Sequence, residues 1–279
     1  MAQHISRGTQ AGFTVIETVL FLAVTGALIA GLLGGIGIAL NNQRYIDSVQ
    51  SFKSLLQSQF SDLDTVANDR SDNWQCSSNA ETSQSSTGSP VPRGQSDCFI
   101  LGRYVVIDQG AVSMTDVIGT EVGGTTSGTG NDIDLLKANY HLNLSTAFTE
   151  VERLEWDTQI AWPKTGASDH DTPKSSPTPR ALVILMIRSP TSGTVYTFTK
   201  DPVSDSELDP TRVGEADLFN MIKGGDAVPG QGDRLICLES NGLSTSGNTG
   251  FYIEAYATNS SAIQTRSNDT KVVGGTAEC

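Results

Sequence analysis

The sequence contains few basic residues and few histidines. Its 279 residues include 18 Lys and Arg against 31 Asp and Glu, so the net charge is −13, and the isoelectric point is about 4.5. This deficit of positive charge excludes a broad electrostatic surface for nucleic acid, and we expect no nucleic-acid partner. An acidic balance suits a secreted, solvent-exposed surface. The three histidines, His4, His141 and His170, are scattered along the chain.

The sequence also lacks a convincing catalytic, cofactor-binding or metal-binding motif. The glycine-rich segment 123–130 has no Lys of a phosphate-binding loop, which indicates a plain loop. Residues 131–134 do not match a calcium-binding loop and predict a helix N-cap with an acidic first turn. Residues 169–171, Asp-His-Asp, lie in a Pro- and Ser-rich segment that predicts solvated surface rather than a metal site. Trp156 and Trp162 are expected to pack in the core, the alternative being stacking on a sugar or a base. We therefore expect no enzymatic activity, no cofactor and no metal.

One long apolar stretch, residues 13–40, organises the chain, and Glu17 is its only charged residue. A helix of these 28 residues would be about 42 Å long, which exceeds the ~30 Å hydrocarbon core of a bilayer, so the stretch can span a membrane. It is too long for an ordinary signal peptide, and no A-x-A cleavage site follows it. A carboxylate at membrane depth costs at least about 2.5–3.5 kcal/mol, which implies that Glu17 has a partner. The alternative is a carboxylate that the positive end of the helix dipole favours.

The residues around Glu17 resemble the class III signal of type IV prepilins and pseudopilins. A short polar leader, residues 1–12, ends in Gly12, and Phe13, Thr-Val-Ile, Glu17 and the apolar helix follow in that order. The resemblance covers about the first 55 residues, and it does not extend to the chain beyond about residue 70.

This resemblance implies how the N-terminus is processed and used. In the family, a membrane peptidase on the cytoplasmic side cuts after the residue that matches Gly12 and N-methylates the new first residue, here Phe13. The carboxylate that matches Glu17 faces the N-terminal amine of a neighbouring subunit during assembly. Pairing would recover much of the hydration that the two buried charges lose, and it would set the axial register of otherwise apolar helices. The resemblance also places the N-terminus in the cytoplasm.

Apolar periodicity beyond residue 40 predicts that the helix continues as an amphipathic helix over residues 41–70. The apolar residues recur at three- and four-residue steps: Tyr45, Ile46, Val49, Phe52, Leu56, Phe60, Leu63 and Ala67. A globular domain is needed to cover this stripe. We therefore predict an α+β, pilin-like fold, in which the long N-terminal helix packs on an antiparallel β-sheet domain formed by residues 71–279.

Apolar runs rich in Val, Ile, Tyr and Phe predict the strands of that domain. The runs are residues 99–107, 181–187, 194–198, 235–238 and 251–257. Residues 189–193, Ser-Pro-Thr-Ser-Gly, predict a hairpin turn. Short helices are expected within residues 131–145 and over residues 215–222.

The sequence has four cysteines, Cys76, Cys98, Cys237 and Cys279, and no C-x-x-C pair, which disfavours zinc and redox sites. An even number of cysteines in an exported chain predicts two disulfides, with free buried thiols as the alternative. Three pairings are open. Nearest-neighbour pairing, which we expect, joins Cys76 to Cys98 around a Ser-rich loop and Cys237 to Cys279, much as a C-terminal disulfide loop does in many pilins.

The resemblance predicts a structural subunit of a type IV pilus or a related filament, and the length of the chain suits a minor pilin. Its partners would be other pilin subunits, the prepilin peptidase and the inner-membrane assembly platform. It would first span the inner membrane once and then enter an extracellular filament. A pseudopilin of a type II secretion system fits the same signal. The alternative from another class is an anchored protein that binds a surface ligand, never polymerises and keeps its leader.

Overall fold

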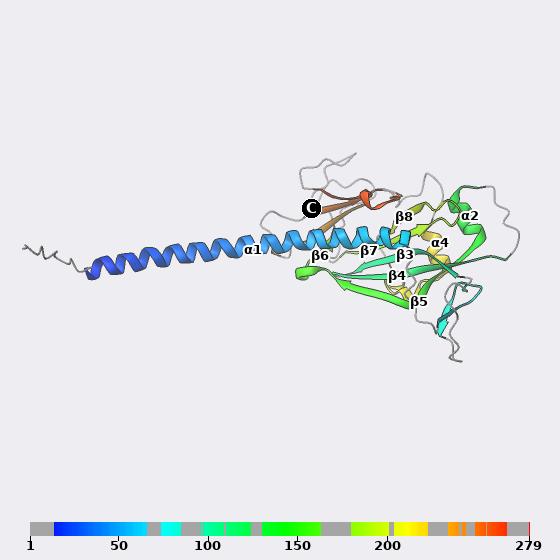
Figure 1. Ribbon diagram of the computed structural model, residues 1–279, viewed down its shortest axis with the longest axis horizontal. Helices are drawn as coiled ribbons and strands as arrows, with labels where there is room; N and C mark the ends of the chain where they lie inside the picture. The colour runs from blue at the N-terminus through cyan, green and yellow to red at the C-terminus, as the bar shows by residue number, and fades with distance from the viewer. Residues whose placement is uncertain are drawn as a thin grey trace, which may run out of the picture.

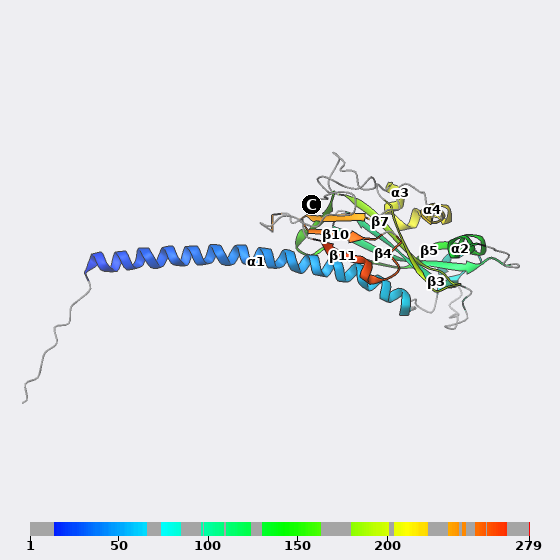
Figure 2. The ribbon, with the colours of Figure 1, turned by 90° about the horizontal axis from the view of Figure 1, so that it is seen from above.

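The computed structural model describes residues 14–65, 74–84, 96, 98–108, 110–123, 130–162, 180–200, 204–222, 234–239, 242–243, 249–254, 256–266 and 279. A single long helix, α1 (Val15–Thr65), carries a β-rich domain at one end (Figure 1). With 51 residues it is about 77 Å long. Its N-terminal half stands clear of the domain, whereas its C-terminal half lies along the domain and curves over it (Figure 2).

The rest of the described chain consists of short helices, antiparallel strands and the segments that connect them. The strands are β1 (Trp74–Cys76), β2 (Thr82–Gln84), β3 (Cys98–Asp108), β4 (Ala111–Glu121), β5 (Tyr140–Arg153), β6 (Gln159–Ala161), β7 (Ala181–Arg188), β8 (Val195–Lys200), β9 (Arg234–Glu239), β10 (Thr249–Ile253) and β11 (Ile263–Arg266). The helices are α2 (Asp132–Asn139), α3 (Asp205–Leu208) and α4 (Glu215–Met221), with 3-10 turns η1 (Glu155–Asp157), η2 (Pro210–Arg212) and η3 (Ser260–Ala262).

The strands form two larger sheets and one hairpin. The five-stranded sheet has the order β5-β4-β3-β7-β8, the four-stranded sheet has the order β11-β10-β9-β6, and β1 pairs with β2. Every strand pairing described is antiparallel. The molecule is therefore an α+β protein with a long N-terminal helix and antiparallel sheets, the fold class that the sequence predicts.

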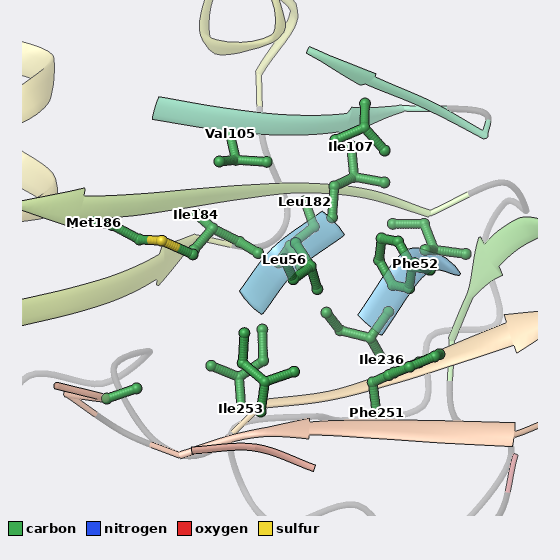
Figure 3. Packing of buried hydrophobic residues seen from close by; sticks show 14 of the residues in the cluster. Phe52, Leu56, Val105, Ile107, Leu182, Ile184, Met186, Ile236, Phe251 and Ile253 are labelled. Atoms are coloured by element: carbon green, nitrogen blue, oxygen red, sulfur yellow. The ribbon is translucent and has the colours of Figure 1, made fainter. Parts of the chain in front are cut away.

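The principal core lies where α1 passes between the two larger sheets. Figure 3 shows Phe52 and Leu56 of α1 between residues of β3 and β7 on one side and residues of β9 and β10 on the other. The rings of Phe52 and Phe251 meet edge to face, with their centroids 5.0 Å apart. Full burial of a side chain of this size contributes roughly 1.5–3 kcal/mol, so the helix and the domain stabilise each other.

The opposite face of the five-stranded sheet forms a second core beneath the short helices. Because successive strand residues point to opposite faces, Val105 and Ile107 join the core around α1, whereas Tyr104 and Val106 join the second core. Helices α2 and α4 cover that face. In β7, residues 182–187 are all buried, so this strand has apolar residues on both faces.

The predicted amphipathic stripe of α1 is confirmed with one correction. Residues Tyr45, Val49, Phe52, Leu56, Phe60 and Leu63 are all buried against the domain. Ile46 is 51 % exposed, so its place in the stripe was wrong, because it lies about 100° around the helix from Tyr45. The helix is described to Thr65, and Ala67 lies outside the described residues.

All five predicted strands are present, with bounds that differ from the prediction by one to four residues, and six strands were not predicted, of which β4 and β5 are long. Strand β8 starts at Val195 and β10 ends at Ile253. The hairpin turn is confirmed, because Gly193 has a φ of +75° and its N–H donates to the Ser189 carbonyl at 2.9 Å. Strands β4 and β5 were not predicted, because the prediction relied on continuous apolar runs and polar residues interrupt both strands. The expected helix after residue 131 stops where β5 begins.

Candidate functional site

The N-terminal half of α1 exposes a long apolar surface. No residue from 15 to 40 is buried, and Leu20, Phe21 and Leu28 are each more than 60 % exposed. Within the described chain this is the one helix long and apolar enough to cross a membrane. A surface of this size is unstable in water, so either lipid or other apolar helices must cover it.

Thr14 and Glu17 cap the N-terminus of α1 through a reciprocal pair of hydrogen bonds. The Glu17 backbone N–H donates to Thr14 Oγ1 at 3.3 Å, and the Thr14 N–H donates to Glu17 Oε2 at 3.5 Å. This is the arrangement of a capping box, which satisfies two N–H groups that a helix start leaves unpaired. The Glu17 side chain is exposed, and no ion pair joins it to another described residue. Gly12 and Phe13, the predicted processing site, lie outside the described residues.

The polar groups inside the apolar half of α1 are paired within the helix. Thr18 Oγ1 donates to the Val15 carbonyl at 2.9 Å, and Thr25 Oγ1 donates to the Phe21 carbonyl at 2.8 Å. A hydroxyl that bonds the preceding turn leaves no donor to be hydrated, so both residues are compatible with an apolar environment. The backbone of this half is also open at its glycines, where an added Cβ atom would have no neighbouring atom within 4 Å. These glycines are Gly26, Gly31, Gly34, Gly35 and Gly37. Small residues let another helix approach closely.

Hydrogen bonds between α1 and the domain are present along the C-terminal half of the helix. The Tyr45 hydroxyl donates to the Leu238 carbonyl at 2.8 Å, near the base of the domain. Further along, Gln57 Nε2 donates to the Ser260 carbonyl at 3.1 Å. Near the end of the helix, Arg188 Nη1 donates to the Leu63 carbonyl at 3.4 Å. Together with the core contacts, these bonds tie α1 and the domain into one unit, so a force on the helix acts on the domain as well.

Both expected disulfides are present in the structure. Cys76 is bonded to Cys98, with 6.2 Å between their Cα atoms, and Cys237 is bonded to Cys279, with 5.3 Å between theirs. The second bridge is buried with Ala161 in a small apolar cluster. It attaches Cys279 to β9, a strand of the four-stranded sheet.

The charged side chains inside the domain have structural partners. Arg103 and Asp116 form a largely buried ion pair at 3.0 Å across β3 and β4. Burial raises the pKa of the Glu207 carboxyl, but hydrogen bonds from Lys200 and Ser204 outweigh this and hold the pKa below its usual value. Burial, together with the nearby Glu207 carboxylate, raises the pKa of Tyr104 far above its usual range. These shifts accompany packing and pairing, and among the described residues no His, Cys, Asp and Glu side chains gather into a group that could hold a metal ion.

The other motifs singled out in the sequence give one confirmation and one correction. Asn131 is the N-cap of α2, because its Oδ1 accepts from the Asp134 N–H at 3.0 Å. Trp156 does not pack in the core, since it is 47 % exposed and lies under the Arg44 guanidinium, 4.8 Å from the ring centroid. Trp162 is half-buried against Arg180. Residues 124–129 and 169–171 lie outside the described part of the chain.

Comparison with known proteins assigns neither a family nor a function to the chain. No protein-family model, curated protein or solved structure matches the chain. Its function is therefore inferred from the exposed helix, the residues at the start of that helix and the attachment of the helix to the domain.

Proposed function

We propose that this chain is a structural subunit, a minor pilin, of a type IV pilus or a related filament. The observation that supports the proposal most is the exposed apolar half of α1, which continues without interruption into the core of a β-rich domain. A subunit of this form can lie in a membrane first and in the helical centre of a filament afterwards. Lipid tails are as apolar as neighbouring helices, so the transfer from one to the other involves little hydrophobic free energy.

In this proposal the residues at the start of α1 control assembly. Prepilin peptidase cuts after Gly12 and methylates Phe13, and the new amine then lies four residues from Glu17 on the sequence. The Glu17 carboxylate, exposed at the first turn of α1, pairs with the amine of a neighbouring subunit. In an apolar filament centre the loss of hydration makes an unpaired charge unfavourable, so pairing selects one axial register.

The proposal also defines partners and location. The chain spans the inner membrane once with its N-terminus in the cytoplasm, where the peptidase and the assembly platform act on it. Other pilin subunits then replace the lipid around residues 15–40, and the domain becomes part of the filament surface. A pseudopilin would use the same helix in a shorter, periplasmic filament.

Mass spectrometry of the mature N-terminus tests the proposal. The chain is expressed with and without a prepilin peptidase, and the N-terminal peptide is sequenced. We expect the peptidase to yield a chain that begins with methylated Phe13. A chain that keeps residues 1–12 in the presence of an active peptidase would contradict the proposal and favour an anchored surface-binding protein. Detection of the chain in sheared surface filaments, rather than in the periplasm alone, would then distinguish a pilus from a secretion system.

A further inference from the structure

The base of the domain displays an exposed tryptophan beside the end of the apolar helix segment. Trp156 lies in η1, the turn between β5 and β6, and Figure 1 places β6 at the end of the domain that faces the free half of α1. The Arg44 guanidinium lies over its ring, 4.8 Å from the centroid. Arg44 is itself exposed.

The height of this pair along α1 corresponds to the surface of a membrane. Leu40 is the last residue of the apolar segment, and Arg44 follows it four positions later, which is about 6 Å along a helix axis. The headgroup zone of a bilayer adds roughly 5–8 Å outside each edge of the hydrocarbon core. Ile46, at a similar height on another side of the helix, is 51 % exposed. With Leu40 placed at the outer edge of the hydrocarbon core, apolar and amphipathic side chains are exposed at the level where the headgroups begin.

The backbone of η1 adopts a costly conformation at the exposed tryptophan. Trp156 and Asp157 are consecutive non-glycine residues with φ of +57°, in the left-handed region that side chains other than glycine rarely adopt. Ser48 of α1 holds the turn, since its hydroxyl donates to the Glu155 carbonyl at 3.1 Å. Strain that the surrounding structure maintains indicates a function for the position.

We infer that η1 and the adjoining turn of α1 form a membrane-contact surface, in which Trp156 and Arg44 lie among the phospholipid headgroups of the outer leaflet. The inference rests on the membrane span of the proposed function and adds a second point of attachment to it. Tryptophan favours this zone because its ring is apolar and its N–H remains hydrated. Three exposed acidic residues are near the pair in the sequence, Asp47 on α1 and Glu155 and Asp157 on either side of Trp156. Attraction to anionic lipid is therefore not the driving force, and added salt should have little effect. Removal of the subunit from the membrane would break this contact.

Fluorescence quenching by labelled lipids tests the contact with the full-length chain in phosphatidylethanolamine and phosphatidylglycerol vesicles. Quenchers are attached either near the headgroup or near the bilayer centre. We expect the shallow quencher to reduce the emission of the wild type, and Trp156→Phe to lose most of that effect. The matched control is Trp74→Phe, which should keep it, because Trp74 lies in the β1–β2 hairpin, coloured cyan at the far end of the domain in Figure 1.

A reporter inside the apolar segment separates failure of this contact from failure of the span. Leu28→Trp, added to Trp156→Phe, should be quenched from the bilayer centre, since Leu28 is 67 % exposed on the free half of α1. If this reporter is quenched while Trp156 is not, the inference is wrong and the membrane span stands. If Trp156 is shielded from a water-soluble quencher but no lipid label reaches it, a second copy of the chain covers the turn and the inference is again wrong. If the Leu28→Trp reporter is not quenched, both the span and the contact are wrong.

Discussion

Tyr45 and Leu238 meet across the base of the domain, although they are 193 residues apart in sequence, and the hydroxyl of Tyr45 donates to the Leu238 carbonyl at 2.8 Å. The same hydroxyl accepts from the Thr249 N–H at 2.6 Å. One side chain of α1 therefore joins β9 to β10 at the point where the helix leaves the domain. Burial of this hydroxyl raises the pKa of Tyr45, so it remains a neutral donor at physiological pH.

We predict that Tyr45→Phe destabilises the protein by about 1–3 kcal/mol, because it leaves a partly buried N–H and a buried carbonyl without this partner. The measurement is denaturant unfolding of the full-length chain in detergent. Tyr140→Phe removes a hydroxyl from a half-buried tyrosine and serves as the control. Equal stability of the Tyr45→Phe variant and the wild type would show that the hydroxyl does not fasten α1 to the domain.

The second prediction concerns the disulfide that ties Cys279 to β9. The two cysteines are 42 residues apart in sequence, and closing a loop of that size stabilises a fold by about 4 kcal/mol in the chain-entropy model. We therefore expect the double change Cys237→Ala and Cys279→Ala to lower the thermal midpoint clearly. The Cys76→Ala and Cys98→Ala pair, which opens a loop with a separation of 22 residues, gives the comparison. Non-reducing peptide mapping that joins Cys76 to either late cysteine would contradict the pairing itself.

The sequence predicts the long helix and the buried strands well because both keep a simple period. Val49, Phe52 and Leu56 recur at helical spacing, and the run of residues 181–187 is apolar throughout, so burial can be inferred directly. Strand β5 was missed because a helical pattern precedes it and because polar residues such as Asn143 break the continuous apolar run on which the strand prediction relied. The left-handed backbone at Trp156 could not be predicted, since no glycine marks it in the sequence.

The third prediction concerns the pH dependence of stability. Hydrogen bonds from Lys200 and Ser204 hold the pKa of Glu207 in the folded protein below its usual value. The ionised carboxylate therefore stabilises the fold at any pH above the pKa of a glutamate in the unfolded chain, about 4.3. This contribution is lost as the pH falls through the lower pKa of the folded state. Glu207→Gln should lower stability at neutral pH by on the order of 1 kcal/mol and flatten the loss of stability below about pH 5. Unfolding measured at several pH values checks this. The exposed Glu81, changed to Gln, should leave the profile unchanged.

The fourth prediction separates the two roles of Glu17. Glu17→Leu should insert in a membrane at least as well as the wild type, because a charge leaves an apolar segment. Incorporation into filaments should nevertheless fall, since the carboxylate that would pair with a neighbouring amine is absent. Glu17→Gln keeps a side chain that can accept from the Thr14 N–H, so it tests whether the capping bond alone suffices. Normal incorporation of Glu17→Leu, measured in purified filaments, would rule out a role of this residue in setting the register.

The last prediction concerns processing at Gly12. In the prepilin-type signal, glycine occupies the last leader position, and the absence of a side chain there lets the peptidase approach the bond to Phe13 closely. Gly12→Val places a β-branched side chain at that point, so we expect full-length protein to accumulate in the membrane and methylated Phe13 to disappear. Gly8→Val, four residues earlier in the same leader, is the matched control and should be cut normally. The readout is the mass of the N-terminal peptide in the presence of the peptidase. A Gly12→Val chain that is still trimmed to Phe13 would show that the peptidase recognises a different bond, and the role proposed for Phe13 and its amine would be wrong with it.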